Sequence, residues 1–135
     1  MVKINMNKKV ILVTEDERSI REALVDKLSK EGFVVFEAKD GIEGWDISTK
    51  EHPDLIFLDL AMPKMDGLSM MKKLLENEST KDIDFIVLTN SDGNEKLAEA
   101  MNLVEKYGSR TLDYYIKSNI KLEDLVEKIK TKLHL

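Results

Sequence analysis

The hydrophobic positions of this chain fall into five short apolar runs, separated by longer segments of mixed character. The runs are rich in β-branched and aromatic residues and have the length of single strands. They occupy residues 10–14, 33–36, 55–58, 85–89 and, more weakly, 112–117. Three of the first four are almost purely apolar, which is typical of parallel strands that are covered on both faces.

Each run is followed by a segment whose apolar residues recur every three or four positions, the spacing of an amphipathic helix. The helices are expected near residues 20–28 (ending before Gly32), 42–50, 68–77, 97–107 and 122–133. Lysines near the end of the last segment suit a helix C-terminus. This alternation predicts an α/β fold, a (βα)5 doubly wound five-stranded parallel sheet with helices on both faces.

Length and composition narrow the class of protein. The 135 residues suit one domain, which we place at 9–135 after a short N-terminal extension at 1–8. The net charge of −5 argues against direct nucleic-acid binding, and the absence of cysteine excludes thiol chemistry. No apolar run is long enough for a membrane span or a secretion signal, so we expect a cytoplasmic protein without membrane insertion. Because the last helix reaches the end of the chain, we expect no output domain.

Polar side chains end or follow four of the five predicted strands. Glu15 and Asp16 follow the first strand, Asp59 ends the third, Thr89 ends the fourth and Lys117 ends the fifth. Ligands of open parallel sheets bind outside the carboxyl ends of the strands. We therefore expect these side chains to meet at one edge of the sheet.

This set of residues has the chemistry of phosphoryl transfer. Two carboxylates about 4 Å apart repel by about 4 kcal/mol at an effective dielectric of 20, a cost that a divalent cation removes. Oxygen ligands of this kind favour Mg²⁺. Asp59 can act as a nucleophile that forms an aspartyl-phosphate, while Lys117 and Thr89 neutralise and bind the phosphoryl oxygens. The set contains no general base for another reaction.

The segment from Asp59 to Gly67, DLAMPKMDG, resembles the D-x-x-M-P-x-M-D-G motif of response-regulator receiver domains. Glu15 and Asp16 look like the acidic pair of that family, and residues 86–89 and 114–117 look like its fourth and fifth strands. The resemblance covers about residues 9–135. It implies a flavodoxin-like, CheY-like sheet with strand order 2-1-3-4-5 and a stand-alone, single-domain response regulator.

The same resemblance implies a metal site and a phosphoacceptor. Asp16 would bind Mg²⁺ directly and Glu15 through a water molecule. Asp59 would be both a metal ligand and the phosphoacceptor, and the carbonyl of Ala61 would be a further ligand. The phosphodonor would be a sensor histidine kinase or a histidine phosphotransfer protein.

A switch is implied as well. Thr89 would close on the phosphoryl group, Lys117 would pair with it, and Tyr114 would swing between outward and inward positions. Tyr114 and its neighbour Tyr115 alternate across a strand, so only one of them faces the fourth helix. The surface of the fourth helix, fifth strand and fifth helix would then change for a downstream protein target, in a monomer or a phosphorylation-dependent dimer.

Other interpretations remain open at this point. The acidic pair alone would fit helix capping, by Asp16 or Ser19. A small Mg²⁺-dependent phosphohydrolase would use Asp59, but Ala61 stands where its second aspartate is needed. A phosphorylation-independent interaction module would keep only the fold.

The chain departs from the family pattern at two places. Ser118 replaces a proline that is often preceded by a cis peptide, and we expect a trans bond because a cis bond before serine costs about 2.5–4 kcal/mol. The segment from Thr89 to Lys117 is longer than usual, which predicts an extra turn in the fourth helix and a longer loop through residues 108–111.

Overall fold

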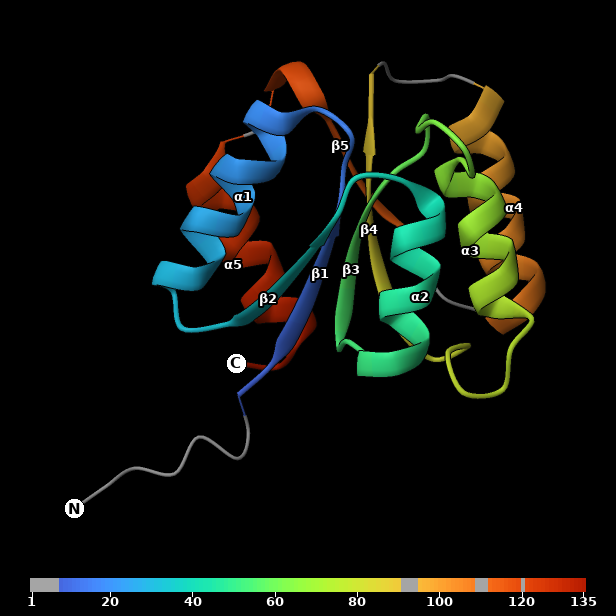
Figure 1. The fold of residues 1–135 in the computed structure, drawn as a ribbon, viewed down its shortest axis with the longest axis horizontal. Coiled ribbons are helices and arrows are strands. Elements are labelled where there is room, and N and C mark those ends of the chain that lie inside the picture. Colours follow the sequence, from blue (N-terminus) through green and yellow to red (C-terminus); the bar gives the residue numbers. More distant parts are fainter. Residues whose placement is uncertain (1–7, 91–94, 109–111, 120) are drawn as a thin grey trace.

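A computed structural model describes residues 8–90, 95–108, 112–119 and 121–135 of the chain. Five strands alternate with five helices (Figure 1). The strands are β1 (Val10–Thr14), β2 (Val34–Ala38), β3 (Leu55–Asp59), β4 (Asp84–Thr89) and β5 (Asp113–Ile116). The helices are α1 (Arg18–Lys30), α2 (Gly41–Glu51), α3 (Gly67–Leu75), α4 (Glu95–Gly108) and α5 (Leu122–Lys132), with a 3₁₀ turn, η1, at Lys117–Asn119.

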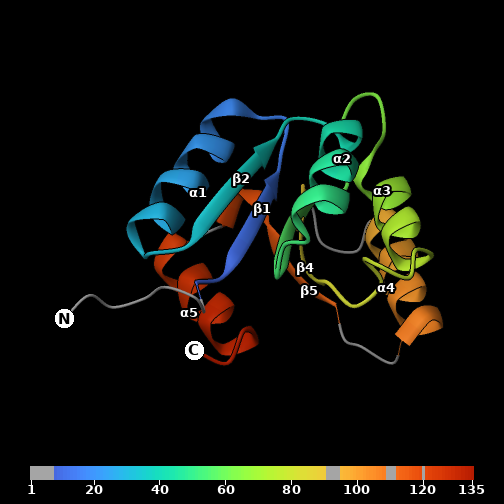
Figure 2. The ribbon, with the colours of Figure 1, turned by 60° about the horizontal axis from the view of Figure 1, so that its bottom comes forward.

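The strands form one parallel sheet in the order β2-β1-β3-β4-β5, which confirms the expected topology. Helices α1 and α5 cover one face, and α2, α3 and α4 cover the other (Figures 1 and 2). No helix in the described part of the chain has the length and apolar character needed to cross a membrane.

The two faces of the sheet bury different side chains. Toward α2–α4 the core is rich in methionine, with Met62, Met70 and Met71 packed around the central strands. Toward α1 and α5 it is built from aliphatic residues and phenylalanine. Every residue of β3 is buried, because its side chains alternate between these two cores. This explains why the strand reads as an uninterrupted apolar run.

Aspartate side chains cap the starts of α2 and α3, whereas α1 and α5 begin without a side-chain cap. The side chain of Asp40 accepts a hydrogen bond from the backbone N–H of Glu43 at the start of α2, and Asp66 accepts one from Ser69 at the start of α3. The N-cap of α1 is Glu17, which makes no side-chain cap bond. The capping interpretation of Asp16 and Ser19 is therefore wrong.

The boundaries differ from the predicted ones where apolar patterning fails. Strand β2 lies at an edge of the sheet and begins and ends later than predicted. Its end extends past the apolar run because its last residues include the exposed Glu37. The described peptide bonds are all trans, as expected for the bond before Ser118. Gly108 ends α4, and residues 109–111 of the expected longer loop lie outside the described residues.

Candidate functional site

The register of the sheet brings the candidate residues together. Thr14 of β1 is paired with Leu58 of β3, so the next residues along these strands, Glu15 and Asp59, lie side by side. The pairing of β3 with β4 and of β4 with β5 carries the same edge onward to Thr89 and Lys117. Parallel pairing thus places all of these residues at the carboxyl edge.

Three carboxylates converge at this edge, as predicted. Glu15, Asp16 and Asp59 each offer one carboxylate oxygen, and these oxygens lie within 4.8 Å of one another. Glu15 and Asp59 are buried, whereas Asp16 is exposed. The cluster therefore has two fixed, buried ligands and a third that is open to solvent, an arrangement able to hold a hard divalent cation.

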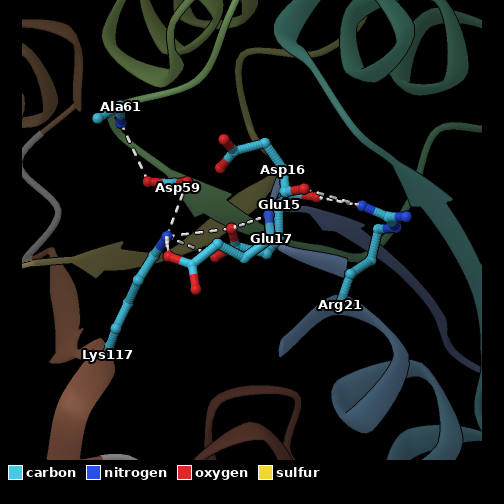
Figure 3. A network of polar contacts seen from close by, with 7 residues as sticks. All are labelled: Glu15, Asp16, Glu17, Arg21, Asp59, Ala61 and Lys117. Carbon is cyan, nitrogen blue, oxygen red and sulfur yellow. Dashed lines mark hydrogen bonds and ion pairs between the residues drawn. The ribbon is translucent and has the colours of Figure 1, made fainter. Parts of the chain in front are cut away.

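Lys117 joins the cluster from the end of β5 (Figure 3). Its Nζ atom lies 2.9 Å from Oδ2 of Asp59 and 2.9 Å from Oε1 of Glu15. A third carboxylate, that of Glu17, lies 3.3 Å from the same nitrogen. The ammonium is thus shared by several anions and leaves the cluster short of positive charge.

Protonation of the site reflects this shortage. Burial, followed by the nearby carboxylates of Asp16 and Glu15, raises the pKa of Asp59 to about 7, against the opposing effect of Lys117. Burial also raises the pKa of Glu15. Burial acts to lower the pKa of Lys117, but its contacts with Asp59 and Glu15 outweigh this and raise it. A second cation at the site would favour the ionised form of Asp59.

Both oxygens of Asp59 are held in place. Oδ1 accepts a hydrogen bond of 3.0 Å from the backbone N–H of Ala61, and Oδ2 accepts the bond from Lys117. Gly67 supports this position, because any side chain there would collide with the carbonyl oxygen of Asp59. The glycine of the motif is therefore required by close packing against the strand end.

An open cavity of about 380 Å³ lies over Asp59. Among the described residues it is lined by Asp59, Leu60, Ala61, Thr89, Asn90, Glu95 and Lys96. Thr89 is buried at the end of β4 and lines this cavity, and its contact with a phosphoryl oxygen stays a prediction. The cavity leaves room for a tetrahedral anion between Asp59 and α4.

The two tyrosines of β5 face opposite sides of the sheet. Tyr114 packs against the core that contains Leu97 and Val104 of α4, whereas Tyr115 packs against the core under α1 and α5. Tyr114 is thus the tyrosine on the α4 side of the sheet, and its role as the switch residue stays a prediction.

Two residues of the site were missed by the sequence analysis. Arg21 donates through Nη1 to the backbone carbonyls of Glu15 (3.0 Å) and Asp16 (3.3 Å), and so fixes the loop that carries the acidic pair. Its Nε atom donates to Glu37 of β2. Glu17 was also overlooked, although it directly follows the acidic pair. Predicting the contacts of either residue requires knowing how α1 is rotated about its axis. The start of this helix directs both side chains back toward the strand ends.

Comparisons with known proteins agree with this geometry. The model of the response regulator receiver domain family matches residues 11–130. A probable transcriptional regulator, ycf27, from Porphyridium aerugineum is 36% identical over 125 residues, which cover 88% of this chain and 51% of that protein. Sporulation initiation phosphotransferase F from Bacillus subtilis is 42% identical over 69 residues, or 51% of this chain and 55% of its own.

Solved structures show the same architecture. A CheY-like response regulator receiver domain protein from Methanospirillum hungatei superposes with a TM-score of 0.80 at 27% identity, covering 94% of each chain. The chain spans about half the length of the first two curated relatives. With the site geometry and a family match over most of its length, the chain belongs to the response regulator receiver domain family and is a phosphoacceptor switch of the two-component type.

Proposed function

We propose that Asp59 is the phosphoacceptor of this switch. The observation that carries the proposal is the pairing of its Oδ2 with Lys117 at 2.9 Å, while Oδ1 is fixed by the N–H of Ala61. This geometry holds the carboxylate facing the open cavity. The residue combines an anchored nucleophile with an adjacent cation, which phosphoryl transfer requires.

Mg²⁺ is the cofactor that the acidic cluster fits. Glu15, Asp16 and Asp59 would hold it, Glu15 through a water molecule, together with the carbonyl of Ala61. Bound there, the ion neutralises charge that develops on the phosphoryl oxygens. Arg21 supports the site from behind by fixing the carbonyls of the acidic pair.

The proposed reaction transfers a phosphoryl group from a phosphohistidine of a sensor kinase or phosphotransfer protein. A carboxylate oxygen of Asp59 attacks phosphorus as the P–N bond breaks, and the electron pair of that bond returns to the histidine nitrogen. Lys117 contacts Asp59 already and can pair with a transferred oxygen, while Thr89 lines the cavity that receives the group. The chain's own residues supply positioning and charge, and no proton transfer is required.

The added phosphoryl group, with a charge of about −1.5 to −2, is expected to draw Thr89 toward it and to let Tyr114 pack inward. Tyr114 is only partly buried against the α4 core, so it can become more deeply buried. The changed surface of α4, β5 and α5 would then bind a downstream protein. The equilibrium between monomer and dimer is also expected to depend on phosphorylation.

We propose a switch rather than a phosphohydrolase. A hydrolase of this type needs an acid–base group near the nucleophile, and the residue two positions after Asp59 is Ala61, which offers only backbone atoms. Repeated release of phosphate from a phosphomonoester would contradict this assignment.

Incubation with acetyl phosphate and Mg²⁺, followed by intact-mass measurement, tests the proposal. The wild-type chain should gain the mass of one phosphoryl group, and Asp59→Asn should gain none. Asp26→Asn is a matched control, because Asp26 is an exposed aspartate that pairs only with Lys30 on α1 among the contacts described. A folded wild-type protein that stays unmodified, or a modified Asp59→Asn, would overturn the assignment.

A further inference from the structure

Glu17 is a fourth carboxylate at the site, and it belongs to no part of the proposed metal set. Its Oε1 atom lies 3.3 Å from Nζ of Lys117, farther than the 2.9 Å contacts that Lys117 makes with Asp59 and Glu15. Its side chain is 53% exposed, whereas that of Glu15 is fully buried. Glu17 is thus the most accessible and most weakly held partner of this lysine.

The backbone fixes Glu17 close to the site even though its side chain is exposed. Its N–H donates to Oε2 of Glu15 at 2.8 Å, and its carbonyl accepts from the N–H of Arg21 in the first turn of α1. The side chain caps no helix N–H. Its only described polar contact is with Lys117, so it is not needed to start the helix.

The ammonium group of Lys117 has three N–H donors, and three carboxylates surround it. A phosphoryl group on Asp59 needs one of these donors. The two buried partners lose most if their contact is broken, because a buried charge without a partner costs more than an exposed one. The N–H group of Lys117 that points to Glu17 is therefore the one that turns to the phosphoryl group.

We propose that Glu17 competes with the incoming phosphoryl group for Lys117, and so restrains both the formation and the persistence of the phosphorylated state. Glu17 is a positioning residue that acts through Lys117. This inference rests on the proposed role of Asp59 and adds to it a residue that sets how readily the switch is charged.

The test compares Glu17→Gln with the wild-type chain under Mg²⁺, using acetyl phosphate and, separately, phosphoramidate. In the first reaction the P–O bond breaks and acetate leaves, and in the second the P–N bond breaks and ammonia leaves after protonation. Acetyl phosphate carries more negative charge than phosphoramidate at neutral pH. Intact mass gives the rate of phosphorylation, and dilution of the donor gives the rate of phosphate loss.

Glu17→Gln should be phosphorylated about fivefold faster with both donors, the rate equivalent of ~1 kcal/mol for one exposed contact. It should also lose its phosphoryl group more slowly, because Lys117 is no longer shared with Glu17. Glu22→Gln is the matched control, since it removes the same charge from an exposed residue of α1 that pairs with Arg18. That variant should behave as the wild type does.

The outcomes separate the two proposals. If neither wild type nor Glu17→Gln gains mass, the role of Asp59 fails. If both gain mass at equal rates, or if Glu22→Gln shows the same acceleration, competition by Glu17 is overturned while Asp59 stands. An acceleration confined to acetyl phosphate would also overturn it, because repulsion of a more highly charged donor would then be the whole effect.

Discussion

Strand β5 has an ion cluster at each end, and the two clusters have opposite proportions of charge. At its carboxyl end, one ammonium, that of Lys117, faces the carboxylates of Asp59, Glu15 and Glu17. At its amino end, one carboxylate, that of Asp113, is paired with Lys132 at 2.8 Å and with Lys128 at 3.1 Å. The first cluster lacks positive charge, whereas the second has an excess of it.

The pKa shifts of the two aspartates run in opposite directions. Burial raises the pKa of Asp59 to about 7. Burial also acts to raise the pKa of Asp113, but its contacts with Lys132 and Lys128 outweigh it and lower that pKa. Ionised Asp59 thus costs stability, while ionised Asp113 contributes to it. The proposed site of phosphoryl transfer is thus the cluster whose negative charge is left uncompensated.

The largest difference is expected when each cluster loses a lysine. Lys117→Met should slow phosphorylation by about 10²-fold, as is usual when a group that stabilises developing charge is removed. It should also lower the free energy of unfolding without Mg²⁺ by roughly 3 kcal/mol, because two buried carboxylates lose their partner. Lys132→Met changes only the cluster at the amino end of β5, where Asp113 keeps its contact with Lys128. Phosphorylation at the carboxyl end of the strand should therefore be unchanged. Equal phosphorylation rates in the two variants would contradict the statement that only the cluster around Asp59 takes part in phosphoryl transfer.

Neutralising each aspartate should change stability in opposite directions. In Mg²⁺-free buffer at pH 8, Asp59→Asn should raise the free energy of unfolding by roughly 2 kcal/mol, because it removes a charge whose ionisation is unfavourable in the folded state. Asp113→Asn should lower the free energy of unfolding by ~1 kcal/mol, a value reduced for the partial exposure of the pair. Urea unfolding of both variants beside the wild type measures these differences.

The pH dependence of these differences follows from the same shifts. The folded pKa of Asp59 is raised, so its cost is present above about pH 7 and disappears as the pH falls toward its unfolded value near 4. The folded pKa of Asp113 is lowered, so its contribution is full above about pH 4 and is lost as the pH falls through the folded value. A stability gain in Asp59→Asn that persists unchanged at pH 5 would contradict the first of these statements.

Mg²⁺ is expected to bind the cluster around Asp59 and not the cluster around Asp113. At about ten times its dissociation constant, Mg²⁺ should stabilise the wild type by ~1.4 kcal/mol through binding to the folded state alone. Asp113→Asn should respond equally, since its cluster offers one carboxylate, whereas Asp59→Asn should respond less because it has lost a ligand. Thermal unfolding in matched ionic strength, with NaCl replacing MgCl₂, measures the gain. If Mg²⁺ stabilised Asp59→Asn as much as the wild type, Asp59 would not be a metal ligand.

The sequence predicted the first cluster better than the second for a physical reason. Apolar runs and alternating helices determine a parallel sheet, and a parallel sheet places strand-end residues such as Glu15, Asp59 and Lys117 at one edge. No comparable rule brings Asp113 together with the two lysines of α5. Their pairing depends on how α5 is rotated and placed on the sheet, which periodicity does not determine.

The same limit applies within the site. Glu17 and Arg21 follow the acidic pair closely in sequence, but their contacts depend on the first turn of α1 and on particular rotamers. Strand β2 was placed slightly early because an edge strand is covered less completely and carries Glu37. Buried, repeated patterns were thus readable, whereas contacts made by single exposed side chains were not.

The smallest expected effect concerns salt, and it sharpens the contrast between buried and exposed charge. At 0.5 M NaCl, exposed interactions are largely screened, so the stability lost in Asp113→Asn should shrink by a few tenths of a kcal/mol. Lys128 is 41% exposed and its contact should weaken most. The gain in Asp59→Asn should change little, because the side chains of Asp59 and Lys117 are 2% and 8% exposed. If salt reduced both differences equally, burial would not be what separates the two ends of β5.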